Sequence, residues 1–397
     1  MRLESTPELE VFRQKVRAFV AEHAPGIKAH AGVRAPEPEL MPAIREWTAK
    51  LFENGFLGIN WPVEFGGRPG AHPLESFIVA EEISRARTWA PIGAATLAAA
   101  AVIDFGTDEQ RERFLPRIRT CTDIWCQLFS EPGAGSDLAA LQTRARLEGD
   151  GDDAVFVVDG QKVWTTNGQH ADMGYLLART DRDAPKHRGI TAFALDMRSP
   201  GVDIRPLREI TGTTDFNEVF LDGVRIPRAN VIGEVNDGWR VAMSSLGHER
   251  SGVAARGVEM FAALDDLVSL AQATTVRGKP ALQDSATRQL IGELATRAQV
   301  NAAMIALAQS RMLHHTEQSA DAPVGKIFFS ELNHDLVAAG MRLQGTQGLL
   351  VDGDPDATAH GWWQDAHLYS RAYTIAGGAN EILRTQIAER GLGLPRG

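Results

Sequence analysis

Apolar side chains recur at the helical spacing of three and four residues through the first part of the chain. Two such stripes are Leu9, Phe12, Val16 and Phe19, followed later by Leu74, Phe77 and Ile78. Between them, the run INWPVEFGGRPG (residues 59–70) carries glycines and prolines that end helices. The pattern therefore predicts a helical block from Pro7 to about Phe114.

From about Cys121 to Gly233 the pattern changes to short β-branched and aromatic runs separated by turn residues. These runs are DAVFVVDGQKVWT, YLLART, GITAFALDM, VDIRPL and NEVFLDGVRIP. The strongest turn signals among them are Asp159-Gly160 and Asp222-Gly223. We expect a small antiparallel β domain here, with a barrel as one possible form.

Long helical segments return from Gly238, with breaks near Arg277 to Pro280 and around Asp352 to Pro355. The predicted fold is α+β, in three parts: an N-terminal helical domain (1–120), a middle antiparallel β domain (121–233) and a C-terminal four-helix-type domain (234–397). No strand-linked GxGxxG opens a helix, which excludes a Rossmann dinucleotide site.

Composition narrows the class of protein. The 397 residues are 44% hydrophobic and 23% charged, which is ordinary for a globular chain with a large core. The net charge of −10 argues against a nucleic-acid or anionic-membrane binder. Cys121 and Cys126 have no set of partners for a metal site or disulfide framework. The polar N-terminus and the short apolar run from Ile92 to Ile103 lead us to expect a soluble cytoplasmic protein.

Two stretches carry candidate chemistry. In CQLFSEPGAGSD (residues 126–137), small residues allow backbone N–H groups to approach a ligand, while Ser130 and Ser136 add hydroxyl donors. A plain surface turn is the alternative. In GQKVWTTNG (residues 160–168), Trp164 at a strand end beside Thr165 and Thr166 suits a flat heteroaromatic cofactor, although a lone tryptophan is often a core residue.

The two stretches in this order resemble the acyl-CoA dehydrogenase family, and the resemblance extends over nearly the whole chain to the ending GGANEILRTQIAERGLG. It implies FAD as cofactor, an acyl-CoA substrate, an electron-transfer flavoprotein as electron acceptor and a homotetramer built from dimers. Ser136 would also lie near the CoA moiety. By resemblance, the flavin end of FAD binds at Gln127, Leu128, Phe129, Ser130, Gly135, Ser136, Trp164, Thr165 and Thr166.

Desaturating an acyl thioester needs a sheltered carboxylate to take the α-proton and positioned donors to hold the charge on the thioester oxygen. Many members of the family carry this Glu in the segment that matches IAGGANEIL, where this chain has Gly377. A minority carry it on an earlier helix, where this chain has SLGHERSG. The backbone N–H of Gly377 would still serve the thioester oxygen, with Gly378 beside the substrate.

Winding residues 239–264 as one helix gives an apolar stripe of Trp239, Met243, Leu246, Val253, Gly257, Phe261 and Leu264. Glu249 falls on the flank of this stripe, Arg250 near its middle and His248 on the opposite side. From the residues alone, a structural ion pair explains these charges as well as a catalytic base does. By resemblance, Glu249 is the base, and Arg250 acts electrostatically near the substrate.

Other cofactor contacts follow only from the resemblance. The segment ATTVRGKPAL has Thr274 at the usual arginine position, and Arg277 replaces its charge toward the FAD of a neighbouring subunit. Gly345 in RLQGTQG approaches the adenine half of FAD, and Ala379 and Glu381 lie near its ribose or phosphates.

The predicted function is FAD-dependent α,β-dehydrogenation of an acyl-CoA thioester to the trans-2-enoyl-CoA. One alternative is a half-site or non-catalytic subunit of a heterotetramer, and another is a flavin-dependent oxidase or monooxygenase on the same fold. The site's missing glutamate side chain, at Gly377, favours branched, alicyclic or steroid-derived acyl groups, and HER and the ending GLGLPRG resemble bacterial dehydrogenases of steroid side chains.

Overall fold

The computed structural model describes residues 6–26, 32–93, 95–248, 252–276 and 278–395, and these divide into two units. Unit 1 takes Met1–Gly32, His72–Ala90 and Arg250–Gly397. Unit 2 takes Val33–Ala71 and Pro91–Glu249. The chain therefore passes from one unit to the other four times.

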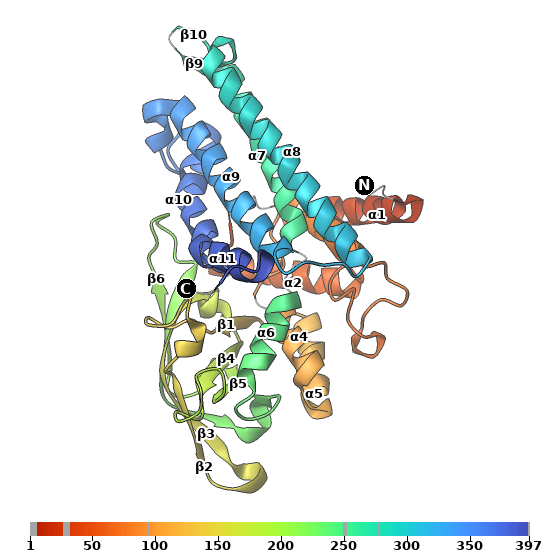
Figure 1. The fold of residues 1–397 in the computed structure, drawn as a ribbon, viewed down its shortest axis with the longest axis vertical. Helices are drawn as coiled ribbons and strands as arrows, with labels where there is room; N and C mark the ends of the chain where they lie inside the picture. The colour runs from red at the N-terminus through yellow and green to blue at the C-terminus, as the bar shows by residue number, and fades with distance from the viewer. Residues whose placement is uncertain (1–5, 27–31, 94, 249–251, 277, 396–397) are drawn as a thin grey trace. The chain divides into compact units, whose positions relative to one another are not determined.

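Unit 1 is helical, as predicted for both ends of the chain. Figure 1 shows α7, α8 and α9 as long neighbouring helices. Their shared core is apolar and includes Leu267, Leu294, Leu332 and Trp363. The helices of this unit are α1 (Pro7–His23), α3 (Glu75–Arg85), α7 (Gly252–Ala273), α8 (Ser285–Leu313), α9 (Asp321–Gln344), α10 (Trp362–Ile375) and α11 (Asn380–Gln386).

Both predicted breaks in the C-terminal block are present. A small hairpin, β9 (Thr275–Val276) and β10 (Lys279–Pro280), separates α7 from α8. Residues 345–361 form only short 3₁₀ turns between α9 and α10. A further break at residues 314–320 was not predicted, because its polar sequence HHTEQSA carries neither glycine nor proline.

An ion-pair network joins α1 to α3 within unit 1. The carboxylate of Glu82 is buried and receives the guanidinium of Arg17 at 2.8 Å and that of Arg13 at 3.0 Å. Arg13 also contacts Glu81 at 2.7 Å. Burial raises the pKa of Glu82, but the two arginines outweigh this and leave that pKa below its ordinary value.

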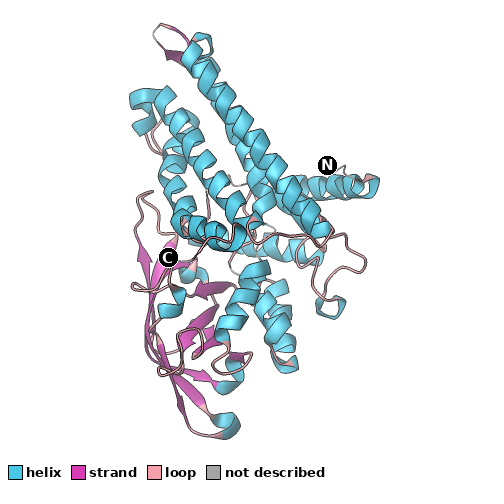
Figure 2. Cartoon of the chain, in the orientation of Figure 1, coloured by secondary structure: helices cyan, strands magenta, loops and turns pink. Residues whose placement is uncertain are grey.

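Unit 2 combines a sheet with four α-helices (Figure 2), namely α2 (Met41–Glu53), α4 (Ala95–Phe105), α5 (Asp108–Arg119) and α6 (Gly238–His248). The strand order is β6-β7-β3-β2-β4-β5-β8, with β1 paired to β4. The strands are β1 (Trp125–Leu128), β2 (Arg144–Glu148), β3 (Val155–Thr166), β4 (Met173–Arg179), β5 (Ile190–Asp196), β6 (Val202–Leu207), β7 (Phe216–Pro227) and β8 (Val231–Ile232).

The predicted antiparallel domain is confirmed for most of the sheet, but β1 and β2 both pair with β4 in parallel. Strand β2 was missed because only Ala145 of its five residues is buried, so the run RARLE shows no apolar alternation. Strand β8 was missed because it is only two residues long.

The two Asp-Gly pairs do not form turns, so that prediction was wrong. Both lie inside paired strands, where the register moves from Val158 opposite Val224 to Gly160 opposite Leu221. One extra residue on β7 makes a bulge, and Gly223 adopts the positive φ of 59° that the bulge requires. The carboxylate of Asp159 accepts the backbone N–H of Gly223 at 2.9 Å.

Apolar side chains cover both faces of the sheet. One face packs on α4 and α6 through a cluster that includes Ala98, Tyr175 and Ala242. The other face is closed by a second cluster that includes Phe156 and Phe193. None of the helices in the described ranges combines the length and apolar character that a bilayer span requires.

The predicted apolar stripe of α6 is rotated in the structure. Val241, Ala242 and Ser245 are buried, whereas Met243 is 39% exposed. Small side chains face α4 and β5 because they let the helix approach closely. A pattern that ranks positions by hydrophobicity alone therefore selected the wrong face.

Candidate active site

The two predicted stretches lie together in unit 2. Strand β1 leads into a tight turn in which Glu131 and Ala134 exchange backbone hydrogen bonds at 3.0 and 3.1 Å. The carbonyl of Ser130 accepts the N–H of Val163 at 2.9 Å, which joins this turn to β3 just before Trp164. The structure thus brings together residues that are about 30 positions apart in the sequence.

A buried ion pair holds the turn in place. The ammonium group of Lys162 is fully buried and donates to Glu131 at 2.8 Å and to the carbonyl of Phe129 at 3.1 Å. The Glu131 carboxylate also accepts the N–H groups of Gln142 at 2.6 Å and Thr143 at 2.8 Å. Glu131 therefore organises the loop and has no spare capacity for a substrate.

Burial and charge act in opposite directions on this pair. Burial lowers the pKa of Lys162 to about 8, although Glu131 opposes the shift. Burial raises the pKa of Glu131, but the charge of Lys162 outweighs that effect and leaves the carboxyl's pKa below its usual value. The sequence analysis missed Lys162, and the available signal was a lysine inside the strand-like run VVDGQKVWT.

Trp164 is held in an unusual conformation. Three residues of β3, from Lys162 to Thr165, oppose two on β7, from Val219 to Asn217, so the strand bulges here. Trp164 has a positive φ of 60°, which costs an L-residue about 1–2 kcal/mol. Its side chain is 61% exposed and meets Phe216 edge to face, with ring centroids 6.1 Å apart.

Polar groups without partners surround this indole. Among the described residues, the hydroxyls of Ser130, Ser136 and Thr166 have no hydrogen-bond partner. Three further polar atoms are buried and unpaired where β3 meets β7: Thr165 Oγ1, Asn167 Oδ1 and Asn217 Oδ1. Buried polar groups normally find partners, so this cluster is suited to a ligand or bound water.

These residues fit a flavin. A Cβ at Gly133 or Gly135 would meet no other atom within 4 Å, so the backbone there is open to a flat ring system. Phe129 is buried and packs edge to face on Tyr175 at 4.9 Å, which makes the inner wall rigid. Gln127 is half-buried on β1 and Leu128 is fully buried on the other face of the sheet.

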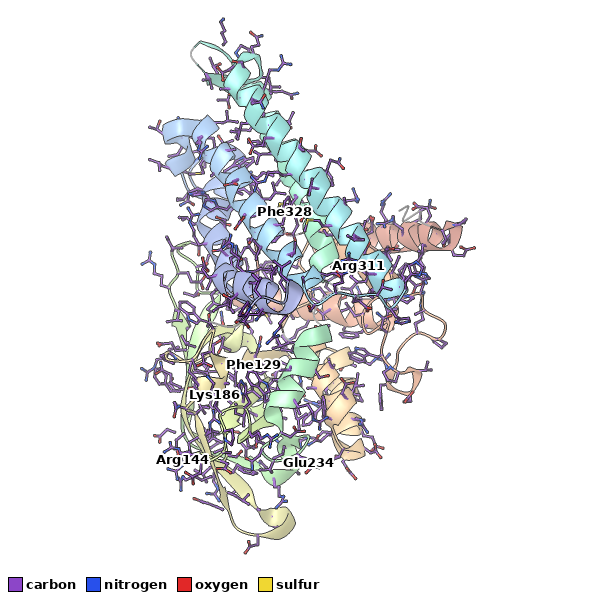
Figure 3. The ribbon with its side chains drawn as sticks, viewed as in Figure 1. Phe129, Arg144, Lys186, Glu234, Arg311 and Phe328 are labelled. Atoms are coloured by element: carbon purple, nitrogen blue, oxygen red, sulfur yellow. The ribbon has the colours of Figure 1, made fainter. Side chains whose placement is uncertain are left out.

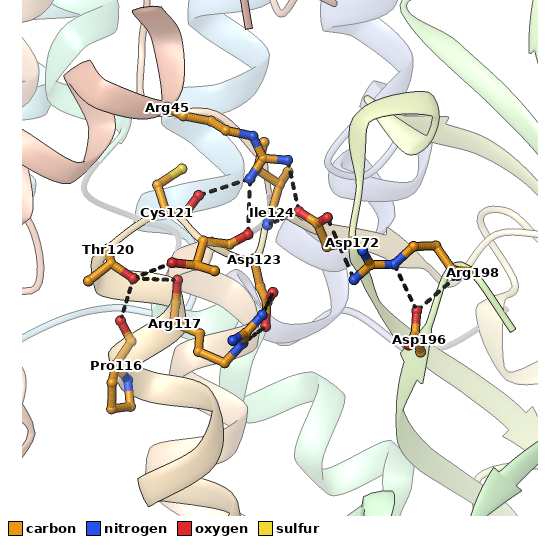
Figure 4. Close-up of polar contacts among 11 residues, drawn as sticks. Arg45, Pro116, Arg117, Thr120, Cys121, Asp123, Ile124, Asp172, Asp196 and Arg198 are labelled. Atoms are coloured by element: carbon orange, nitrogen blue, oxygen red, sulfur yellow. Dashed lines mark hydrogen bonds and ion pairs between the residues drawn. The ribbon is translucent and has the colours of Figure 1, made fainter. Parts of the chain in front are cut away.

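A polar cluster anchors the segment that precedes β1 (Figure 4). Arg45 of α2 donates to the carbonyl of Cys121 at 2.9 Å and to the carboxylate of Asp172 at 2.8 Å. Asp172 also accepts the N–H of Ile124 at 3.0 Å. This network fixes the entry of the chain into β1 and, through it, the position of Gln127.

The C-terminal stretch IAGGANEIL lies in unit 1. Gly377 and Gly378 adopt positive φ angles of 66° and 96° and are exposed. The Nζ of Lys326 donates to the carbonyl of Gly378 at 2.6 Å and to Asn380 Oδ1 at 2.8 Å. The turn is therefore built, and Lys326 is a supporting residue that the sequence analysis missed.

The remaining predicted residues have the following positions. Ala379 is the residue before α11, and Glu381 is exposed in the first turn of that helix. Gly345 ends α9 with a φ of 58°. Glu249, Arg250 and Arg277 lie outside the described residues, so their assignments stay predictions.

Comparison with known proteins gives three matches to family models. They are the acyl-CoA dehydrogenase N-terminal domain over residues 6–121, the middle domain over 126–224 and the C-terminal domain over 236–392. Acyl-CoA dehydrogenase IpdE1 of Mycobacterium tuberculosis is 38% identical, over 98% of each chain. Acyl-CoA dehydrogenase FadE34 of the same organism is 38% identical over 96% of this chain and 52% of its own length.

Solved structures match over the full length. A structure described as the Tcur3481-Tcur3483 steroid ACAD has a TM-score of 0.88, at 30% identity over 100% of both chains. The ChsE4-ChsE5 complex from Mycobacterium tuberculosis has a TM-score of 0.84, at 31% identity over 100% of both chains.

Proposed function

The chain belongs to the acyl-CoA dehydrogenase family and is an oxidoreductase, and from this premise we propose that it uses FAD to convert an acyl-CoA thioester to the trans-2-enoyl-CoA. The observation that carries the proposal is the exposed indole of Trp164, held in a strained bulge beside unpaired hydroxyls. A flavin bound along Gln127–Ser136 and Trp164–Thr166 would accept the hydride from the β-carbon.

In this proposal the chain's own residues manage the proton and the charge on the thioester. Glu249 takes the α-proton, and Arg250 adds positive charge near the substrate. The N–H of Gly377 donates to the thioester oxygen, where negative charge grows as the proton leaves. The absence of a side chain at Gly377 and Gly378 supports this role, because it leaves the backbone open to a bulky ligand.

Replacing Glu249 tests the assignment. Glu249→Gln keeps the shape of the side chain but removes the base, so we expect kcat to fall by about 10²–10⁴-fold with flavin still bound. Turnover of an acyl-CoA with a dye acceptor and the visible flavin spectrum measure the two properties.

Glu381→Gln serves as the matched control, because Glu381 is the exposed carboxylate next to the glycine turn. It should retain turnover within about tenfold of the unmodified protein, since it is not the base. A Glu249→Gln variant that turns over normally, or a Glu381→Gln variant that alone loses activity, would sink the assignment of the base.

We also propose an electron-transfer flavoprotein as the electron acceptor. Rapid oxygen consumption without an added acceptor would instead indicate an oxidase or monooxygenase. The chain shares 30% identity with a structure described as a steroid ACAD, which supports a ring-containing or branched acyl group. A panel of acyl-CoA thioesters tests this, and a clear preference for short straight chains would contradict it.

A heteromeric assembly is the second candidate, favoured by the likeness to the ChsE4-ChsE5 complex. If the chain is a half-site subunit, the protein purified alone will contain less than one flavin per chain and will gain activity when its partner is added. Full flavin content and turnover from the single chain support the homomeric enzyme.

A further inference from the structure

A basic hollow lies on unit 2 beside the turn that carries Ser136. Its volume is about 360 Å³, and it is bounded by the loop after β4 and the segment 139–142. Three alanines and Gln142 leave room inside it, and its charged walls are Arg179, Arg182 and Lys186. None of the described residues that line it carries a carboxylate.

Arg179 joins the two sides of the hollow. It is only 7% exposed, and its guanidinium donates to the carbonyls of Ala139 at 2.6 Å and Lys186 at 2.9 Å. The loop is stiffened further by Asp181, whose carboxylate accepts the N–H groups of Asp183 at 2.9 Å and Ala184 at 3.1 Å. The hollow is therefore a built feature of the fold.

The other two cations are available to a ligand. Arg182 is exposed and has no hydrogen-bond or ion-pair partner within the described ranges. Lys186 contacts only Asp137 in an ion pair, at 2.9 Å, with both side chains more than half exposed. Such exposed pairs contribute little stability, so a phosphate can replace the carboxylate at low cost.

We propose that this hollow binds the phosphate groups of the CoA carrier. Arginine and lysine are the usual phosphate ligands in proteins, and CoA carries a 3′-phosphate and a diphosphate. Asp137 follows Ser136 directly, so its contact with Lys186 brings the hollow next to the predicted substrate turn. Figure 3 shows Lys186 and Phe129 within the sheet-bearing unit. The inference rests on the proposed function, and it makes the enzyme selective for CoA thioesters over thioesters of shorter carriers.

Binding of 3′,5′-ADP to the flavin-loaded protein tests the site without turnover. We expect the double variant Arg182→Gln/Lys186→Gln to raise the Kd at least about tenfold by calorimetry, because two charge-assisted contacts are lost. Arg188→Gln is the matched control, since Arg188 is an exposed cation of the same loop that does not line the hollow. Equal weakening by control and double variant, or none by the double variant, would overturn the proposal, as would inorganic phosphate binding as tightly as 3′,5′-ADP.

Carrier length tests the same site during turnover. For the unmodified enzyme, kcat/KM should fall from acyl-CoA to acyl-dephospho-CoA to acyl-pantetheine. The double variant should narrow the ratio of the first to the last by about tenfold. An unchanged ratio means a structural role and overturns the inference. If no thioester is turned over while 3′,5′-ADP binding still depends on Arg182, the proposed dehydrogenase function fails and this site stands.

Discussion

At the residue scale, Trp164 shows how the fold spends stability on a site. A bulky residue at φ 60° within a strand is strained, and its exposed side chain gains little packing in return. Such strain persists where the surroundings enforce it, and it gathers at binding sites. The sequence analysis recognised Trp164 as a cofactor candidate but could not see the bulge that presents it, because the bulge depends on the register between β3 and β7.

Replacing Trp164 separates strain from binding. In flavin-free protein, Trp164→Gly should be about 1 kcal/mol more stable than Trp164→Ala, because glycine adopts a positive φ without cost. Both variants should bind FAD more weakly than the unmodified protein. Urea unfolding and flavin titration measure these effects. If the alanine variant bound FAD as tightly as the unmodified protein, Trp164 would not be a cofactor contact.

At the element scale, local pattern was sufficient for most helices and strands, while pairing was not. The runs DAVFVVDGQKVWT and NEVFLDGVRIP predicted β3 and β7, yet their Asp-Gly pairs form a bulge and not turns. The same limit applies to α6, whose buried face uses Ala242 and Ser245. Which face of a helix is buried depends on how closely its neighbours approach, and the sequence does not state that distance.

The contact of α1 with α3 predicts an acid-sensitive stability. Glu82→Gln should cost about 2 kcal/mol at neutral pH, because it removes the buried acceptor of Arg13 and Arg17. The lowered pKa of Glu82 means that its contribution is fully present above its ordinary pKa near 4.5 and is lost as the pH falls through the lowered value.

Urea unfolding of the Glu82→Gln variant and the unmodified protein, from pH 7 downward, measures this contribution. The gap between the two should close as the pH falls. Glu81→Gln is the control and should cost less than about 1 kcal/mol, since Glu81 is partly exposed. A gap that stays constant down to low pH would show that Glu82 contributes through packing and not through charge.

At the scale of the whole molecule, we expect a homotetramer. Exposed apolar side chains near the C-terminus, including Ile375, Leu392 and Leu394, are candidates for an interface. Light scattering should give four times the mass of the 43.1-kDa chain. A monomer would contradict this prediction, and a tetramer that forms only with a second protein would favour the heteromeric assembly.

The order in which the chain supplies its two units has a consequence for its synthesis. Helices α1 and α3 emerge early, but their unit is completed only by residues 250–397. At roughly 5–20 residues per second, the ribosome needs on the order of 10–30 s between α3 and α7. Throughout that interval, the apolar faces of α1 and α3 lack the helix that covers them. Nascent chains of this protein are therefore expected to depend on chaperones that shield exposed helices during translation.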